Sequence, residues 1–128
     1  MRLIDSSVIV KFFSEEPGWE GLKGYLYTPI SIELSTKELS SALLKKVRSK
    51  QLEFGAAMQI IGRYPNISRF IEQKRHLGKA FEIAYEHKIS FYDSLFIAAA
   101  QEQGYELVTC DKRQAEVARK VRVKVITC

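Results

Sequence analysis

Four acidic residues lie where an apolar, strand-like segment ends or where an amphipathic, helix-like segment begins: Asp5, Glu38, Asp93 and Asp111. In an open α/β sheet, the carboxyl ends of parallel strands and the adjacent helix starts converge on one crevice, so acids far apart in sequence meet there. Four carboxylates in one crevice would repel one another, and a hard divalent cation is the usual partner that offsets this repulsion. The pattern therefore predicts one acidic, metal-binding pocket.

Asp5 and Asp111 share a local context, because each follows a short apolar strand and has a hydroxyl residue nearby. Ser6 and Ser7 follow Asp5 directly, and Thr109 stands two residues before Asp111. Hydroxyls in such positions can orient a carboxylate that binds a metal. Each aspartate could instead cap the helix that follows it, which is a position that Asp favours.

Glu38 and Asp93 have a rival structural explanation, the capping box. Ser35 with Glu38, and Ser90 with Asp93, both match the pattern in which an acid bonds back to the amide of the capping residue. Asp93, however, lies near the start of a segment from 89 to 100 that is apolar nearly all round. This pattern predicts a central helix. An unpaired charge held near the interior would be costly, and a cation would supply its missing partner.

The elements that must position these acids alternate between strand and helix patterns. Strands are expected at 3–4, 28–34, 67–71, 107–111 and 123–126. Helices are expected at 5–13, 19–25, from a cap at Ser35 to Lys50, from Phe54 to just before Pro65, at 77–88, at 90–104 and at 113–119. This alternation predicts an α/β fold, a three-layer α/β/α sandwich with a mainly parallel sheet of four to five strands.

Length and composition fit one globular domain over residues 1–128. The chain is 46% hydrophobic and 27% charged, and its size is sufficient to bury roughly two thirds of its unfolded surface. No apolar run approaches the roughly 18 residues of a membrane span, and Met1 leads straight into a strand pattern with no signal peptide. A cytoplasmic location is therefore expected.

The charge is moderately basic, at +5, and residues 111–128 hold six Lys or Arg against two acids. A polyanionic partner fits this balance, and so does an ordinary solvated surface. Beside an acidic pocket, cations on the rim are what a polyphosphate substrate requires; the candidates are Lys45, Arg48, Lys112 and Arg113. Basic residues at the end of the 35–50 helix also match the helix dipole.

Cys110 and Cys128 are too few for a secreted disulfide framework, and His76 and His87 stand alone rather than in a zinc-binding spacing. Buried, inert thiols are the default expectation. Both cysteines nevertheless fall at the ends of predicted strands, and they could be bridged if those strands are neighbours.

The whole chain resembles PIN domains, in particular the toxin subunits of VapBC-type toxin–antitoxin pairs. Four short motifs carry the resemblance, in the family's order: Leu3-Ile4-Asp5-Ser6-Ser7-Val8-Ile9, Glu38-Leu39-Ser40-Ser41-Ala42-Leu43, Ser90-Phe91-Tyr92-Asp93-Ser94-Leu95 and Leu107-Val108-Thr109-Cys110-Asp111. Glu33 is a nearby alternative to Glu38 if the helix starts earlier than expected.

The resemblance implies a metal-dependent ribonuclease. The partners it implies are an antitoxin protein and a second copy of the chain in a homodimer. It further implies that Asp5, Glu38, Asp93 and Asp111 coordinate Mg²⁺ or Mn²⁺, directly or through water, with Ser7 and Thr109 as supporting polar residues. Metal-held water would then hydrolyse RNA phosphodiesters. Asp5 and Asp93 are the expected ligands of the principal ion, and oxygen-only ligands favour Mg²⁺ or Mn²⁺ over zinc.

Three rival functions remain to be compared. A signalling receiver domain would need an adjacent acidic pair after the first strand, whereas this chain has Asp5-Ser6-Ser7. A phosphatase with an aspartyl nucleophile would want Asp-x-Asp there, and Ser7 occupies the second position. A non-catalytic RNA- or protein-binding module, in which the acids serve only as caps, stays open.

Overall fold

The computed structural model describes every residue from Met1 to Cys128. The strands are β1 (Arg2–Ile4), β2 (Ile30–Ile32), β3 (Arg69–Ile71), β4 (Glu106–Thr109) and β5 (Val125–Thr127). The α-helices are α1 (Ser6–Phe13), α2 (Leu34–Arg48), α3 (Phe54–Ile67), α4 (Leu77–His87), α5 (Phe91–Gln103) and α6 (Lys112–Lys120), and the 3-10 helices are η1 (Trp19–Tyr25) and η2 (Lys74–His76). The predicted alternation of strands and helices is confirmed.

All strand pairs are parallel, as the sequence predicted. β4 lies between β1 and β5 in a three-stranded sheet, and β2 pairs with β3 separately. The two sheets meet where the Ser31 hydroxyl of β2 donates to the Ile4 carbonyl of β1 at 2.6 Å. The predicted sheet is therefore present, divided into three strands and two.

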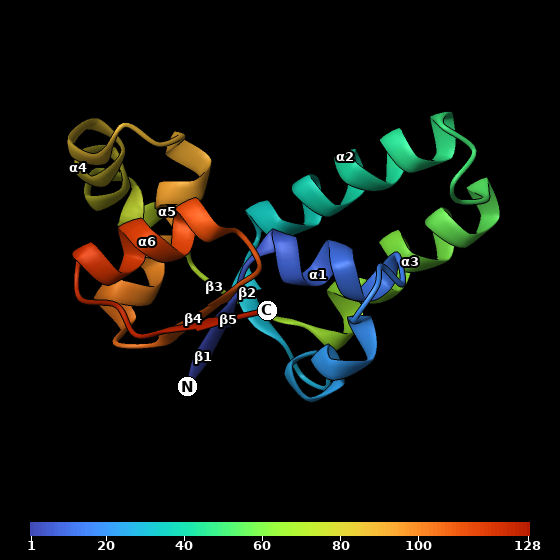
Figure 1. Cartoon of the computed structure of the whole chain (residues 1–128), viewed down its shortest axis with the longest axis horizontal. Coiled ribbons are helices and arrows are strands. Elements are labelled where there is room, and N and C mark those ends of the chain that lie inside the picture. The colour runs from blue at the N-terminus through green and yellow to red at the C-terminus, as the bar shows by residue number, and fades with distance from the viewer.

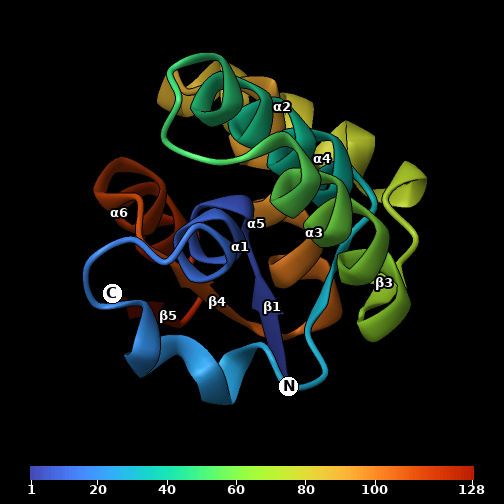
Figure 2. The same cartoon turned by 90° about the vertical axis from the view of Figure 1, so that its right-hand side faces the viewer.

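Helices cover both faces of the central strands (Figure 1). Adjacent strand residues point to opposite faces, so β1 and β4 contribute to two hydrophobic cores. Leu3 and Leu107 pack into a core with α4, α5 and α6, whereas Ile4 and Val108 pack into a core with α1, α2 and α3. After a quarter turn, α1 is seen nearly end-on above β1 and β4, with α5 behind it (Figure 2). The three-layer arrangement is confirmed.

α5 is the central helix that its apolar pattern predicted. Its residues from Ser94 to Ala100 are all buried, and it ends at Gly104 in the left-handed conformation that favours glycine. None of the helices combines the length and hydropathy that a membrane crossing requires.

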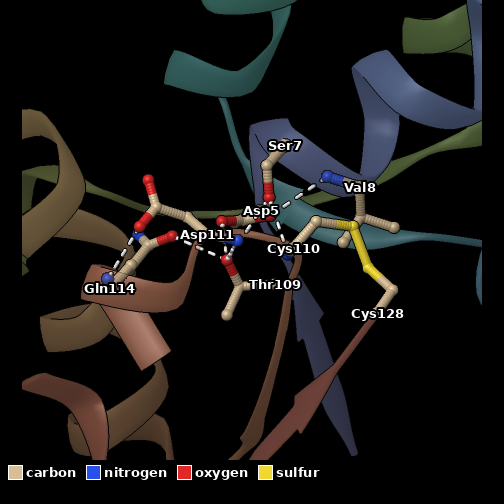
Figure 3. Close-up of a disulfide and its surroundings, with 8 residues drawn as sticks. All are labelled: Asp5, Ser7, Val8, Thr109, Cys110, Asp111, Gln114 and Cys128. Atoms are coloured by element: carbon tan, nitrogen blue, oxygen red, sulfur yellow. Dashed lines mark hydrogen bonds between the residues drawn. A yellow bond between two sulfur atoms is a disulfide. The ribbon is translucent and has the colours of Figure 1, made fainter. Parts of the chain in front are cut away.

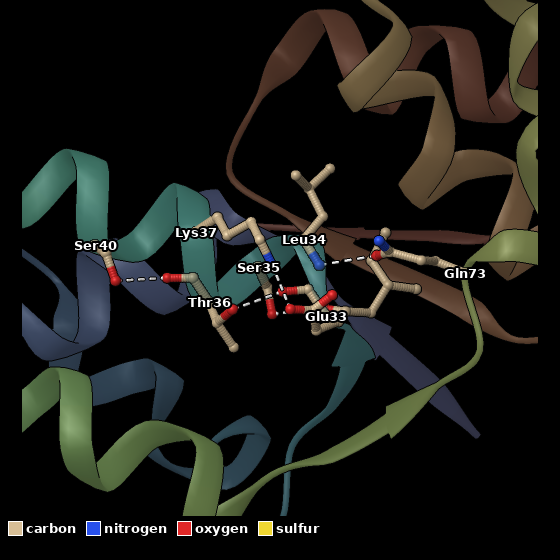
Figure 4. Close-up of polar contacts among 8 residues, drawn as sticks. Glu33, Leu34, Ser35, Thr36, Lys37, Ser40 and Gln73 are labelled. Carbon is tan, nitrogen blue, oxygen red and sulfur yellow. Dashed lines mark hydrogen bonds and ion pairs between the residues drawn. The ribbon is translucent and has the colours of Figure 1, made fainter.

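The predicted cap of the second long helix is wrong. α2 begins at Leu34, and the Ser35 hydroxyl instead donates to the Ile32 carbonyl at 2.7 Å and lies 2.8 Å from the Tyr64 hydroxyl. The amide of Leu34 donates to Oε1 of Gln73 at 2.8 Å, so a distant side chain caps the helix start (Figure 4). A tertiary contact thus replaces the local capping that the sequence pattern indicated.

The predicted end of the third helix is also wrong, because α3 continues through Pro65 to Ile67. Proline disfavours helix interiors, yet it lies here in the last turn, where few further hydrogen bonds are lost. Fully buried Tyr64 anchors this turn, and the Ser68 hydroxyl donates to the Tyr64 carbonyl at 2.6 Å. Asn66 donates its side-chain amide to the Gly62 carbonyl at 3.2 Å. Tertiary packing and side-chain bonds therefore extend the helix.

Cys110 and Cys128 form a disulfide, with their Cα atoms 4.8 Å apart. They directly follow Thr109 and Thr127, which are register partners on neighbouring strands β4 and β5. The default expectation of free thiols is therefore wrong, and the alternative based on strand adjacency describes the structure.

Candidate functional site

All four predicted acids line one cavity of about 400 Å³. The cavity opens where β1 and β4 end and where α1, α2, α5 and α6 contribute residues from their cavity-facing sides. Ser6, Ser7 and Gln114 also line it. The crevice that the topology predicted is present and is acidic.

Asp5 is the most buried of the acids, at 2% exposure, and three donors surround its carboxylate (Figure 3). Oδ1 accepts from the Ser7 hydroxyl at 2.6 Å and from the Val8 amide at 3.2 Å, so Asp5 caps α1. Oδ2 accepts from the Thr109 hydroxyl at 2.5 Å. The two hydroxyls chosen from the sequence, Ser7 and Thr109, thus both contact Asp5.

Asp111 also caps its own helix, α6, by accepting from the Gln114 amide at 2.9 Å. Gln114 then extends the network, because its Nε2 donates to the Asp93 carbonyl at 3.0 Å and its Oε1 lies 3.0 Å from the Thr109 hydroxyl. Capping and pocket lining therefore occur together at Asp5 and Asp111 rather than excluding each other.

Glu38 faces the cavity, and no capping box forms around it. Its Oε1 accepts from the Ser6 hydroxyl at 2.7 Å, a contact between the starts of α1 and α2. Glu33, the alternative acid, is exposed, pairs with Lys37 on the outer side of α2, and does not line the cavity (Figure 4). The structure thus brings Glu38, and not Glu33, to the other acids.

Asp93 lies in the first turn of α5, where Ser90 is the capping residue. The Ser90 hydroxyl accepts from the Asp93 amide at 3.1 Å, which is one half of the predicted capping box. The carboxylate of Asp93 is half-buried and lines the cavity. A structural cap and an acid that faces the pocket are again compatible.

Crowding and burial disfavour the charged forms of these acids. Burial, opposed by bonds from Ser7, Thr109 and Val8 and reinforced by the charge of Asp111, raises the pKa of Asp5 to about 6. Burial, with a contribution from the charge of Asp93, raises the pKa of Glu38. Burial and the charge of Asp111 likewise raise the pKa of Asp93. The acids therefore share one electrostatic environment that a cation would relieve.

The donor set of the cavity suits a hard divalent ion, since the four side chains offer only carboxylate oxygens. In the observed rotamers, no three His, Cys, Asp or Glu side chains are grouped closely enough to hold one ion. The chemistry of the donors fits Mg²⁺ or Mn²⁺, and rotation of the side chains into the cavity would be needed to complete a shell.

The basic residues that the sequence put forward lie outside the cavity. Lys45 and Arg48 are exposed in the last turn of α2, which extends away from the strands beside α3 (Figure 1). Lys112 and Arg113 are exposed in the first turn of α6, next to Asp111. Arg113 pairs with Glu116 at 3.2 Å and donates to the His87 carbonyl at 2.8 Å. Contact of these residues with a substrate stays a prediction.

Three residues of the cavity were missed from the sequence. Gln114 is 3% exposed and connects the neighbourhoods of Asp5, Asp93 and Asp111. Its only signal is its place three residues after a capping acid. Lys11 and Glu16 line the cavity wall from α1 and the turn that follows, and Lys11 lies one turn after Ser7, on the same helix face, which the sequence could have shown.

The fold and the cavity define an α/β protein with parallel strands and four carboxylates at their carboxyl ends. Comparison with protein families matches residues 2–120 to the PIN domain. The chain therefore belongs to the PIN domain family. No curated protein matches its sequence.

Two solved structures are similar in fold. One is the protein PAE2754 from Pyrobaculum aerophilum, at 21% identity and a TM-score of 0.75, covering 91% of this chain and 83% of that one. The other is a toxin–antitoxin complex from Klebsiella pneumoniae, at 16% identity and a TM-score of 0.63, covering 90% of each chain. These similarities confirm the α/β fold.

Proposed function

We propose that this protein is a metal-dependent endoribonuclease. The observation that carries the proposal is that Asp5, Glu38, Asp93 and Asp111 line one cavity at the carboxyl ends of parallel strands. Membership of the PIN domain family supports it. No side chain in the cavity is placed as a Ser-His or Cys-His pair, and Cys110, which also lines it, is held in a disulfide.

In the proposed site, the four carboxylates hold Mg²⁺ or Mn²⁺. Such an ion, when bound, makes water nucleophilic at neutral pH and offsets the charge that develops on a phosphoryl group. Ser7 and Thr109 keep Asp5 in one rotamer through their bonds to its two oxygens. Ser6 and Gln114 hold Glu38 and the α5–α6 corner in the same way. Hydrogen bonds of this kind limit the freedom of carboxylate oxygens.

We further propose that the protein acts as the toxin of a toxin–antitoxin pair, with a cognate antitoxin and a second copy of the chain as partners. Support comes from the structural similarity to a toxin–antitoxin complex. An antitoxin that binds the protein would inhibit RNA hydrolysis until the antitoxin is removed. The net charge of +5 suits an RNA substrate.

The direct test is RNA cleavage by the purified protein. Transfer RNA, ribosomal RNA and messenger RNA should each be incubated with Mg²⁺ or Mn²⁺, with and without a chelator. We expect endonucleolytic cleavage of at least one class that stops on chelation and resumes when metal is added back. RNA binding with no cleavage under any metal condition would favour the non-catalytic binding module, in which Asp5 and Asp111 act only as helix caps.

A matched pair of substitutions tests the assignment of the acid from α2. Glu38→Gln should reduce cleavage more than about a hundredfold, because it removes one anionic oxygen donor while its amide can still bond to Ser6. Glu33→Gln removes the same charge five residues away, on the exposed side, and should leave cleavage unchanged. Initial rates at saturating metal decide between them. The reverse ranking would move the fourth ligand to Glu33.

A further inference from the structure

The acidic cavity contains a single cation, Lys11. Five carboxylates line the wall, the four discussed above and Glu16. Glu16 is already paired with Lys46 at 3.1 Å. Lys11 itself forms no ion pair with any carboxylate of the chain. Lys11 is therefore the one cationic residue on the wall of the cavity, and its ammonium has no carboxylate partner.

The turn after α1 lies beside the Lys11 side chain. The Glu16 amide donates to the Lys11 carbonyl at 3.0 Å, which folds residues 14–18 back over the end of the helix. Gly18 then lies against the ammonium, since a Cβ at this position would be 3.5 Å from Nζ and 3.6 Å from Cε. Gly18 has φ +91°, a conformation that favours glycine. The ammonium thus lies beside the Gly18 turn, within ordinary contact distance of a Cβ at that position.

A lysine in the last turn of a helix also interacts favourably with the helix dipole. The dipole alone would be served equally by an ammonium in solvent, however, and it does not account for a half-buried side chain on the wall of the cavity. A cation placed beside carboxylates without being consumed in an ion pair remains able to bind an incoming anion.

We propose that the Lys11 ammonium binds a non-bridging phosphate oxygen of the RNA substrate and so positions the backbone against the carboxylates. This inference rests on the proposed ribonuclease function. A polyanion entering an acidic cavity is repelled, and one fixed cation on the wall lowers that repulsion and defines where a phosphate lies. Lys11 is then a substrate-binding residue and not a ligand of the metal site.

Lys11→Met tests this role, because methionine keeps most of the apolar stem and removes the charge. Lys124→Met is the matched control, since Lys124 also forms no ion pair. It is exposed to solvent and precedes β5 at the opposite, amino-terminal end of the strands. With a single-stranded RNA that the wild type cleaves, we expect Lys11→Met to raise KM about tenfold, the usual scale for one bond to a charged group. Lys124→Met should leave KM unchanged, and Lys11→Arg should recover most of the affinity.

Two further measurements separate substrate binding from support of the acids. In an Asp93→Asn background, which blocks cleavage, the salt dependence of RNA binding should weaken by about one phosphate contact when Lys11 is replaced. Binding of Mn²⁺ to Lys11→Met in the absence of RNA should be unchanged or tighter, because a neighbouring positive charge has been removed.

Unchanged KM and salt dependence in Lys11→Met, with an active wild type, would overturn the role of Lys11 alone. Weaker Mn²⁺ binding in Lys11→Met would also overturn it, since the lysine would then order the carboxylates. Failure of the wild type to cleave any RNA would instead overturn the proposed function. Melting curves that match the wild type exclude misfolding as the cause of a raised KM.

Discussion

Asp93→Asn is expected to abolish metal-dependent RNA cleavage while leaving the fold intact. The carboxylate lies in the cavity at the head of the buried helix α5, and the substitution removes its charge without changing its volume. Changes to groups that only support metal ligands already cost roughly 10–100-fold, so loss of a ligand should exceed about a hundredfold. Single-turnover cleavage with saturating Mg²⁺ or Mn²⁺ measures the effect.

Glu86→Gln is a suitable control for Asp93→Asn, because Glu86 is an exposed acid on α4 that forms no ion pair. It should cleave at the wild-type rate. Circular dichroism should be the same for all three proteins, since the bond between the Asp93 amide and Ser90 does not involve the substituted group. Asp93→Asn should melt no lower than the wild type, because the raised pKa of Asp93 means that its charge opposes folding at neutral pH. Full activity in Asp93→Asn would refute the metal-dependent nuclease.

Asp5→Asn is expected to stabilise the metal-free protein at neutral pH. The folded protein raises the pKa of Asp5 from 3.8 to about 6, so ionised Asp5 opposes folding by up to about 3 kcal/mol at pH 7. Asparagine carries no charge and fits the existing bonds. Its Oδ1 can accept from Ser7 and Val8, and its amide can donate to Thr109, whose hydroxyl proton then turns to Gln114.

The pH dependence of this effect has a definite sign. Because the pKa of Asp5 is higher in the folded state, the folded protein binds more protons between about pH 4 and 6. The free energy of unfolding therefore falls as pH rises through this window and is not lowered further by Asp5 above it. Raised pKa values at Glu38 and Asp93 act in the same direction. In Asp5→Asn, the free energy of unfolding should still fall as pH rises, but less steeply than in the wild type.

Chemical denaturation between pH 4 and 8, in the presence of a chelator, measures both the gain and the slope. Added Mn²⁺ should stabilise the wild type at pH 7.5 and should stabilise Asp5→Asn much less, because a preferred ligand is gone. Glu86→Gln controls for the loss of one negative charge. Lower stability of Asp5→Asn at pH 7.5 without metal would show that the buried charge is compensated within the chain.

The acids of the cavity were easier to predict from the sequence than the residues that surround them. Asp5 and Asp111 follow short apolar strands, and parallel strands bring their carboxyl ends together, so the meeting of these acids follows from pattern and topology. Gln114 and Lys11 reach the cavity from helix positions whose only sequence signals are their spacings from Asp111 and Ser7. Their importance depends on which face of α6 and α1 is turned inward, and that is decided by packing.

The errors in the predicted fold also arise because tertiary packing is not visible in a local sequence pattern. The pattern around Ser35 satisfied a local capping rule, yet Gln73 provides the actual bond to the start of α2. Pro65 predicted the end of α3, yet burial of Tyr64 carries the helix past it. In both places tertiary contacts outweigh a local preference, which is about 1 kcal/mol for a helix cap and about 3 kcal/mol for a proline inside a helix. The central helix α5 was predicted well, because its unbroken apolar run leaves one way to bury it.

The Cys110–Cys128 bridge also decides how mechanical load enters the molecule. A force applied at Cys128 passes through the two sulfurs into Cys110 and β4. It therefore bypasses the intervening segment, which spans a sequence separation of 18 and contains α6 and β5. Because the disulfide bypasses them, α6 and β5 do not carry the applied force. The tension arrives instead beside the Cys110 amide, which donates to Ser7 at 2.9 Å. Cys128 is thus mechanically anchored, through Cys110, at the wall of the acidic cavity.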